Sequence, residues 1–122
     1  TPMQWNGRDG AGFTTGLPWL GINGNKDEIN VEKEEGDKDS ILSYYRALIS
    51  FRKEHDDLVY GDYELIRNDK WVTEYRRGAL YIVINHSNKE IRRKREGEIL
   101  LSSEKNRKNG FLKPWEALME RR

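Results

Sequence analysis

The first 38 residues of the chain follow neither the 3.6-residue period of a helix nor the two-residue period of a strand. They hold six glycines before Asn25 and two of the three prolines, which is the composition of a loop. The same stretch begins TPMQW and continues GFTTGLPW, so it also holds two tryptophans and a methionine. Irregular segments of this length are uncommon inside a compact domain unless they pack on a larger body. We therefore expect residues 1–38 to be a loop arm that lies against something else.

A single amphipathic helix is predicted over residues 39–55. Apolar and aromatic side chains recur there at intervals of three and four residues, at Ile41, Leu42, Tyr45, Leu48 and Ile49. Asp39 or Ser40 can cap its first turn, because a short polar side chain can accept from the free N–H groups there.

From Gly61 onward the period changes to two. Short runs of alternating character occupy residues 62–66, 71–75, 80–84, 98–101 and 112–119, with turn signals such as Asn-Asp and Lys-Asn-Gly between them. This pattern predicts an antiparallel β-sandwich of five or six strands. Pro114 lies inside the last run and has no N–H to donate, so we expect an edge strand or a bulge there. The chain is thus expected to be α+β, with arm and helix in residues 1–57 and the sandwich in residues 58–122.

Composition excludes several classes of function. Lysine and arginine total 22 against 21 aspartates and glutamates, and a net charge of +1 gives no global field for nucleic acid or an anionic membrane. The chain has no cysteine, which excludes disulfides, thiol catalysis and cysteine-ligated zinc. Its longest apolar run, residues 79–84, is far short of a membrane span. We expect a cytoplasmic protein with no cofactor, no metal, no membrane contact and no nucleic-acid partner.

Side chains that could do chemistry occur in patterns typical of a solvated surface. The acidic residues of 32–39 alternate with Lys33 and Lys38, which is typical of a charged, exposed linker. His55 and His86 are the two histidines, and neither has a nucleophile motif or a glycine-rich turn nearby. We assign no catalytic residue among them.

The densest basic cluster is Arg-Arg-Lys-Arg at residues 92–95. Such a tract can bind nucleic acid, but Glu90, Glu96 and Glu98 flank it and no aromatic residue is interleaved with it. We favour a polar strand edge or loop that discourages edge-to-edge pairing.

Seven aromatic side chains could form either the core or a platform for sugar rings. They are Trp5, Phe13, Trp19, Trp71, Tyr75, Tyr81 and Trp115. Core packing is favoured for most of them, because a small domain with 35% hydrophobic residues needs large side chains to fill its interior.

A set of motifs in the first 67 residues resembles the C-terminal region of the α-amylase superfamily (glycoside hydrolase family 13). They are TPMQW, AGFTTG, PW, INVE at residues 29–32, the helix SILSYYRALISFRKEH, and LVYGDYE at residues 58–64. The branch it most resembles comprises oligo-1,6-glucosidases, dextran glucosidases and trehalose-6-phosphate hydrolases. Further along, YIVINHSNKE, EILLSS and LKPWEA resemble strands of the C-terminal antiparallel β-sandwich of that family.

This resemblance implies a place for the arm. Residues 1–38 would end the loop after the eighth strand of a (β/α)₈ barrel, and residues 39–55 would be the eighth barrel helix. The side chains that would pack on the barrel are Met3, Trp5, Phe13, Trp19, Tyr45 and Leu48. The three catalytic carboxylates of the family precede the TPMQW motif, so none maps onto this sequence. Gln4 and Trp5 are the candidates for a position at the rim of the active site.

The resemblance therefore predicts the C-terminal structural domain of an intracellular α-glucosidase that hydrolyses α-glucosidic bonds of short oligosaccharides. Isomaltose-type sugars, trehalose-6-phosphate and sucrose stay open as substrates of the parent enzyme. The chain itself is expected to be non-catalytic, to pack on the catalytic barrel, and to self-associate through the arm when that barrel is missing. The alternative is a stand-alone carbohydrate-binding or protein-interaction β-module.

Overall fold

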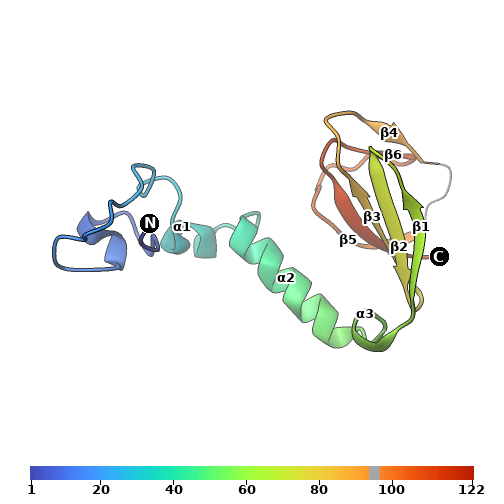
Figure 1. Ribbon diagram of the computed structural model, residues 1–122, viewed down its shortest axis with the longest axis horizontal. Coiled ribbons are helices and arrows are strands. Elements are labelled where there is room, and N and C mark those ends of the chain that lie inside the picture. Colours follow the sequence, from blue (N-terminus) through green and yellow to red (C-terminus); the bar gives the residue numbers. More distant parts are fainter. Residues whose placement is uncertain (94–96) are drawn as a thin grey trace. The chain divides into compact units, whose positions relative to one another are not determined.

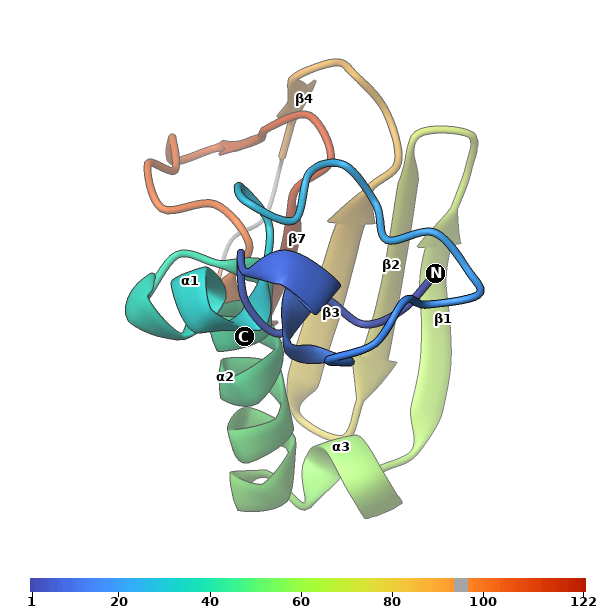
Figure 2. The same ribbon diagram turned by 90° about the vertical axis from the view of Figure 1, so that its left-hand side faces the viewer.

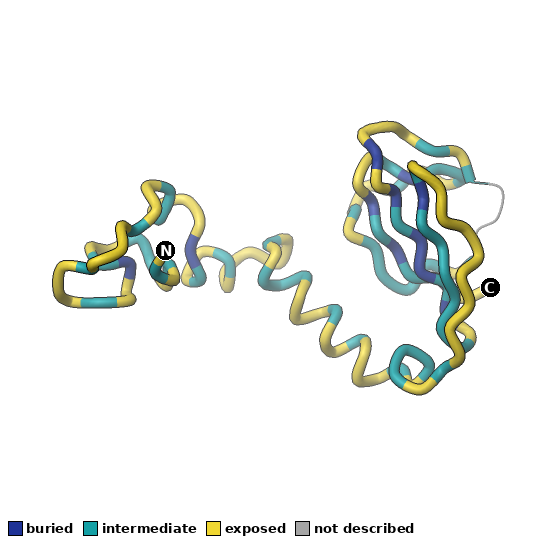
Figure 3. The backbone as a smooth tube through the Cα atoms, in the orientation of Figure 1, coloured by how far each residue is buried: buried dark blue, intermediate teal, exposed yellow. Residues whose placement is uncertain are grey.

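The computed structural model describes residues 1–93 and 97–122 (Figure 1). The chain divides into two compact units, Thr1–Phe51 and Arg52–Arg122, and the division falls within helix α2, which runs over Ile41–Glu54. Most backbone of the first unit is exposed, whereas buried residues gather on the strands of the second (Figure 3).

The arm contains two short regular elements. A 3₁₀ turn, η1, spans Asp9–Gly12, and a helix, α1, spans Val31–Gly36. The expected loop over residues 1–38 is therefore wrong at α1. The helix forms because the Asn30 side chain accepts a hydrogen bond from Lys33 N at 2.9 Å, which caps the first turn.

Helix α2 confirms the helix expected over residues 39–55. Ser40 is its cap, since Ser40 Oγ accepts from the backbone N–H of Ser43 at 3.1 Å. Arg52 and Lys53 lie in the last turn, where positive charge is favoured by the helix dipole.

The second unit is mostly antiparallel sheet, as expected (Figure 2). A short helix, α3 (Asp57–Tyr60), leads into seven strands: β1 (Tyr63–Asn68), β2 (Val72–Arg77), β3 (Leu80–Asn85), β4 (Ile91–Arg92), β5 (Glu98–Ser102), β6 (Phe111–Leu112) and β7 (Ala117–Arg121). Five of them form one sheet in the order β1-β2-β3-β7-β5, and β4 pairs with β6 in a second, two-stranded sheet.

The core of this unit joins the two sheets. Val83 lies opposite Leu118 in the register of β3 and β7, and Val72 projects from the same face of the five-stranded sheet. Leu112 of the two-stranded sheet packs against these side chains, and all four are at most 2% exposed. Trp71, Ile91 and Ile99 pack around them. The prediction that Trp71 packs in the core is thus confirmed.

The expected strand over residues 112–119 is wrong in the middle. A turn at residues 113–116 separates β6 from β7, and Pro114 lies in that turn. β7 lies between β3 and β5, so it is not the edge strand that Pro114 suggested. The turn removes the conflict, because a proline outside the ladder has no ladder hydrogen bond to lose.

Candidate functional site

The TPMQW motif is tied by its backbone to the entry of α1. Val31 N donates to Gln4 O at 3.0 Å, and Glu32 N donates to Trp5 O at 3.0 Å. The Gln4 side chain donates from Nε2 to Ile29 O at 2.5 Å. Gln4, one of the two candidates for the active-site rim, therefore uses its side-chain amide to bind Ile29 of its own chain. This hydrogen bond fixes the TPMQW motif against the INVE segment.

A tight turn closes the other side of the motif. Trp5 N and Asn6 N both donate to Ala11 O, at 2.8 and 3.3 Å. Ala11 is fully buried with φ 54°, and Gly12 follows with φ 67°. A side chain at Gly12 would meet the Asn6 amide at 2.6 Å, so this close approach needs glycine.

Large apolar side chains of the arm stay exposed although its backbone is fixed. Met3 is 51% exposed, Trp5 50%, Phe13 56% and Trp19 92%. Three of these barrel-packing candidates, Met3, Phe13 and Trp19, share a hollow of about 450 Å³ with Leu17 and neighbouring residues. Trp5 is not among the lining residues.

The two barrel-packing candidates on α2 differ in exposure. Tyr45 is 61% exposed, and Leu48 is half-buried. Burial raises the pKa of the neighbouring Tyr44. The exposed stripe also includes Ile41 and Ile49.

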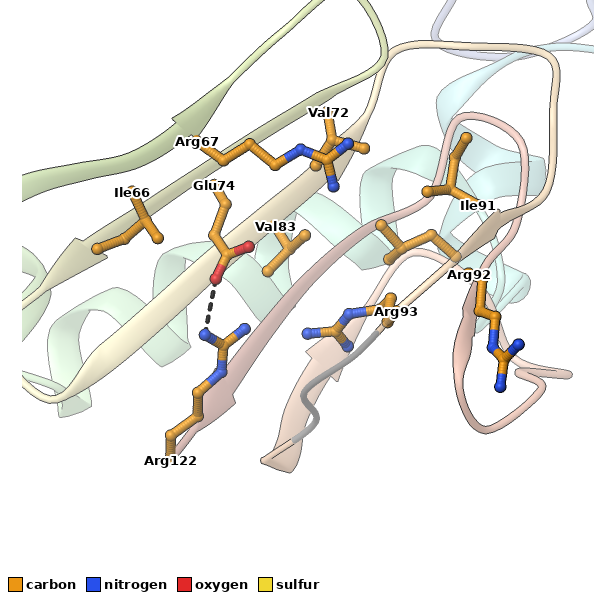
Figure 4. A pocket seen from close by; sticks show the side chains of 10 residues that line it. Ile66, Arg67, Val72, Glu74, Val83, Ile91, Arg92, Arg93 and Arg122 are labelled. Carbon is orange, nitrogen blue, oxygen red and sulfur yellow. Dashed lines mark ion pairs between the residues drawn. The ribbon is translucent and has the colours of Figure 1, made fainter.

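A second hollow, of about 540 Å³, opens between the sheets of the second unit (Figure 4). Its apolar wall is formed by Ile66, Val72, Val83, Ile91 and Leu112, and its charged wall by Arg67, Glu74, Arg92, Arg93 and Arg122. Four arginines and one glutamate line this hollow, and such an excess of positive charge is typical of an anion-binding site.

Two of those arginines, Arg93 and Arg122, belong to a buried chain of ion pairs, whereas Arg67 pairs with Asp69 at the surface at 2.6 Å. Glu120 is fully buried, and its Oε1 accepts from Arg93 Nη2 and Arg122 Nη2, each at 2.6 Å. Arg122 Nη1 reaches Glu74 Oε1 at 2.7 Å, as Figure 4 shows. Burial acts to raise the pKa of Glu120, but hydrogen bonds from Arg93, Gly97 and Arg122 outweigh burial and lower this pKa. Glu74, Arg93 and Arg122 of this hollow are thus held by ion pairs within the protein.

An exposed tryptophan lies in the turn between β6 and β7. Glu116 N donates to Lys113 O at 3.2 Å and closes a four-residue turn with Pro114 second and Trp115 third. Trp115 has φ 62°. Proline second and a positive φ third are the features of a type II turn, which favours glycine or asparagine at the third position. A side chain there costs roughly 1–2 kcal/mol.

Trp115 is 66% exposed, so the core expectation is wrong for this residue. Its turn is held by buried polar groups. Glu116 is fully buried and accepts from Lys113 N at 2.8 Å, Ser102 Oγ at 3.0 Å and Arg107 Nε at 2.5 Å. Asn85, 1% exposed, donates from Nδ2 to Lys113 O at 2.7 Å. These bonds fix the turn from both sides.

Other candidates take part in structural contacts. His86 Nε2 lies 2.8 Å from Thr73 Oγ1 on the sheet surface, and Glu35 of the acidic run pairs with Arg46 at 2.8 Å. Within residues 1–93 and 97–122, no group of three His, Asp or Glu side chains could hold a metal ion. In the same residues, no helix is long and apolar enough to cross a bilayer.

The basic cluster at residues 92–95 lies only partly in the described structure. Arg92 belongs to β4, and the Arg93 side chain is 5% exposed and paired with Glu120. Lys94 and Arg95 lie outside the described residues. An inward Arg93 does not contribute to the exposed patch that phosphate binding requires.

The comparisons with known proteins agree with this architecture. The α-amylase catalytic-domain family matches residues 1–61, half of the chain. The chain therefore belongs to the α-amylase family of glycoside hydrolases.

The more specific relatives are glucosidases and related enzymes. The chain is 54% identical over 69 residues to the probable oligo-1,6-glucosidase 2 of Bacillus subtilis (strain 168), which covers 57% of this chain and 12% of that protein. It is 39% identical over 103 residues to the trehalose-6-phosphate hydrolase of Escherichia coli (strain K12), covering 81% of this chain and 19% of that protein. It thus spans less than a fifth of the length of these relatives.

Solved structures give the same relationship. The isomaltulose synthase of Klebsiella sp. LX3 has a TM-score of 0.91 and 34% identity to this chain, covering 99% of this chain and 24% of the synthase. The trehalose-6-phosphate hydrolase of Bacillus licheniformis has a TM-score of 0.88 at 34% identity, covering 98% of this chain and 25% of the hydrolase.

Proposed function

We propose that the chain is the C-terminal part of an α-glucosidase that hydrolyses α-glucosidic bonds of short oligosaccharides. In this proposal, residues 1–57 complete a (β/α)₈ barrel and residues 58–122 form the C-terminal β-sandwich domain. The chain contributes structure and contains none of the catalytic carboxylates, which the resemblance places before the TPMQW motif. A cytoplasmic location belongs to the same proposal.

The observation that carries this proposal is the contrast within the arm. Its backbone is held by hydrogen bonds such as Trp5 N to Ala11 O, yet Met3, Phe13 and Trp19 are more than half exposed. A monomer rarely leaves such side chains uncovered, since their burial is favourable at about 25 cal/mol per Å². The match of residues 1–61 to a catalytic domain supports a barrel as the covering body.

The outer face of the five-stranded sheet offers a second apolar surface. Tyr63 is 57% exposed and Leu65 50%, and both lie on the face of Tyr75. Contact with the parent enzyme through this face is part of the proposal.

A chimera tests the proposal. This chain would replace the matching C-terminal segment of the Bacillus subtilis relative, and hydrolysis of isomaltose would be measured. We expect the chimera to fold and to hydrolyse isomaltose, while the 122-residue chain alone hydrolyses no α-glucoside. Turnover by the pure chain would contradict the non-catalytic role, and a chimera that folds without activity would contradict the place of the arm in the barrel.

Substituting Trp19 distinguishes the two settings. Because Trp19 is 92% exposed, Trp19→Ser should change the stability of the isolated chain by less than about 0.5 kcal/mol. In the chimera the same change should cost about 3–5 kcal/mol if the barrel buries this side chain. Tyr60→Ser is the matched control, because Tyr60 is 82% exposed and lies outside the arm.

Self-association of the isolated chain through the arm follows from the same exposed side chains. Light scattering should give a mass above that of a 14.4 kDa monomer, falling to the monomer mass when Phe13 and Trp19 are replaced by serine. A wild-type monomer at all concentrations would contradict it. A stand-alone carbohydrate-binding module is a second candidate, which the exposed Trp115 favours.

A further inference from the structure

Trp115 occupies a backbone position that suits glycine. The type II turn at residues 113–116 puts its φ at 62°, in the left-handed region that bulky side chains avoid. Core packing does not account for the residue, because Trp115 is 66% exposed. Trp115 is thus a bulky, exposed residue at a position where its backbone is strained. Such strain is typical of residues with a function, here a function of the side chain itself.

The turn presents this side chain from a fixed backbone. Trp115 N donates to Ser87 O at 3.1 Å, which joins the turn to the segment after β3. Ser87 and Asn85 are buried, and Ser87 N and Oγ donate to Asn85 Oδ1 at 2.9 and 2.7 Å. Together with the buried Glu116, these bonds hold the backbone of the turn in one conformation, so binding through Trp115 costs no backbone entropy there.

Two charged side chains of the turn, Lys113 and Glu116, are paired within the protein. Lys113 Nζ reaches Glu104 Oε2 at 3.2 Å, and Glu116 accepts from Arg107. Asn88, exposed and one residue after Ser87, adds an uncharged amide that can donate and accept hydrogen bonds. The surroundings therefore suit a neutral, hydroxylated ligand better than an anion.

We propose that Trp115 is a stacking platform for a glucopyranose ring of an α-linked glucooligosaccharide, with the Asn88 amide available to its hydroxyl groups. The C–H face of a pyranose ring is flat and apolar, and it can cover the exposed indole while the hydroxyl groups stay hydrated. The residues of this binding site, Trp115 and Asn88, both belong to the sheet unit. It rests on the proposed function only for the choice of α-linked glucose as ligand.

Nuclear magnetic resonance of the 122-residue chain tests this site. The four tryptophans give four indole N–H signals, and Trp115→Phe identifies the one from Trp115. Titration with isomaltotriose should shift this signal to saturation and leave the signal of Trp19 unchanged. No saturable shift, or an equal shift of all four signals, would overturn the proposal.

Two substitutions separate binding from folding. Trp115→Ala and Trp115→Gly should each weaken isomaltotriose binding at least about tenfold, which corresponds to 1.4 kcal/mol. Glycine also relieves the backbone strain, so the Gly variant stays folded if the Ala variant does not. Tyr60→Ala, which removes another exposed aromatic residue, should leave the affinity unchanged. Retained binding in the folded Gly variant would overturn the proposal.

Failure of the Trp115 site and failure of the proposed function can be distinguished by experiment. The isomaltose assay of the chimera reports on the arm and the barrel, and the Trp115 variants of the chimera should keep that hydrolysis of a disaccharide. Loss of chimera activity with intact isomaltotriose binding would contradict only the proposed function. Intact activity without binding would contradict only the Trp115 site.

Discussion

Replacing Glu120 with glutamine should strongly destabilise the sheet unit, because Glu120 is fully buried and ion-paired. Glu120→Gln keeps the shape of the side chain but removes its charge from between Arg93 and Arg122, whose side chains are 5% and 19% exposed. Arg122 keeps its ion pair with Glu74, whereas Arg93 loses the pair with Glu120. Breaking a buried ion pair by removing one partner costs about 3–5 kcal/mol.

That loss is a large part of the 5–15 kcal/mol that stabilises a typical domain. For a unit of this size it should lower the melting temperature by roughly 12–40 °C. Urea unfolding followed by circular dichroism measures the free energy directly. Glu98→Gln, at an exposed position of β5, is the matched control and should change it by less than about 0.5 kcal/mol. A loss below about 1 kcal/mol in Glu120→Gln would refute the reasoning.

The same variant should change the response to acid. The folded state lowers the pKa of Glu120, so its carboxylate stabilises the fold above the ordinary glutamate pKa of about 4.3. This stabilisation is lost as the pH falls through the lowered pKa. Wild-type stability should therefore fall more steeply below pH 4 than that of Glu120→Gln, and parallel curves would contradict the assignment.

Three further predictions concern single positions. Hydrogen bonds from two backbone N–H groups and from Arg67 lower the pKa of Asp69 to about 2. Titration of the Asp69 carboxyl group by NMR should therefore give a midpoint near 2, which rises only partly in Arg67→Gln. A midpoint near 4 in the wild type would contradict this prediction. Gly78→Ala should lower the free energy of chemical unfolding by about 2 kcal/mol or more, because φ is +54° and a new Cβ would overlap the Asp57 side chain. Gly24→Ala is the control and should cost little, because the space around Gly24 is open. Equal effects of the two substitutions would exclude the steric cause. Trp115→Gly should be more stable than Trp115→Ala by about 1 kcal/mol in the same assay, and the reverse order would show that the turn is unstrained.

The periodic parts of the fold were predictable from the sequence. The apolar spacing after Ser40 predicts α2, and the runs at 62–66, 71–75, 80–84 and 98–101 match β1, β2, β3 and β5 to within two residues at each end. β4 and β6 were not predictable from period, because each has two residues and a period of two needs at least four to be recognised.

The buried charges were not predictable for a different reason. Glu120 follows Leu118 by two residues on β7 and so projects from the same inward face, where the local pattern predicts an apolar residue. Its partner Arg93 is 27 residues earlier, and only the fold brings the two together. Trp115 shows the same limit at short range. Pro114 indicated an edge strand or a bulge, and in the type II turn that forms instead, glycine rather than tryptophan is the expected next residue.

The arm combines both situations. Its hydrogen bonds join residues far apart in sequence, such as Gln4 to Ile29 and Val31, so no local period announces them. Yet these bonds satisfy the backbone without burying the large apolar side chains, and Trp19 stays 92% exposed. A segment that fixes its own backbone and keeps its apolar side chains outward has the properties of a preformed interface, since little conformational entropy is left to lose when a partner covers it. The hydrogen bonds and the exposed side chains of the arm thus favour a covering body by themselves, as the family resemblance also does.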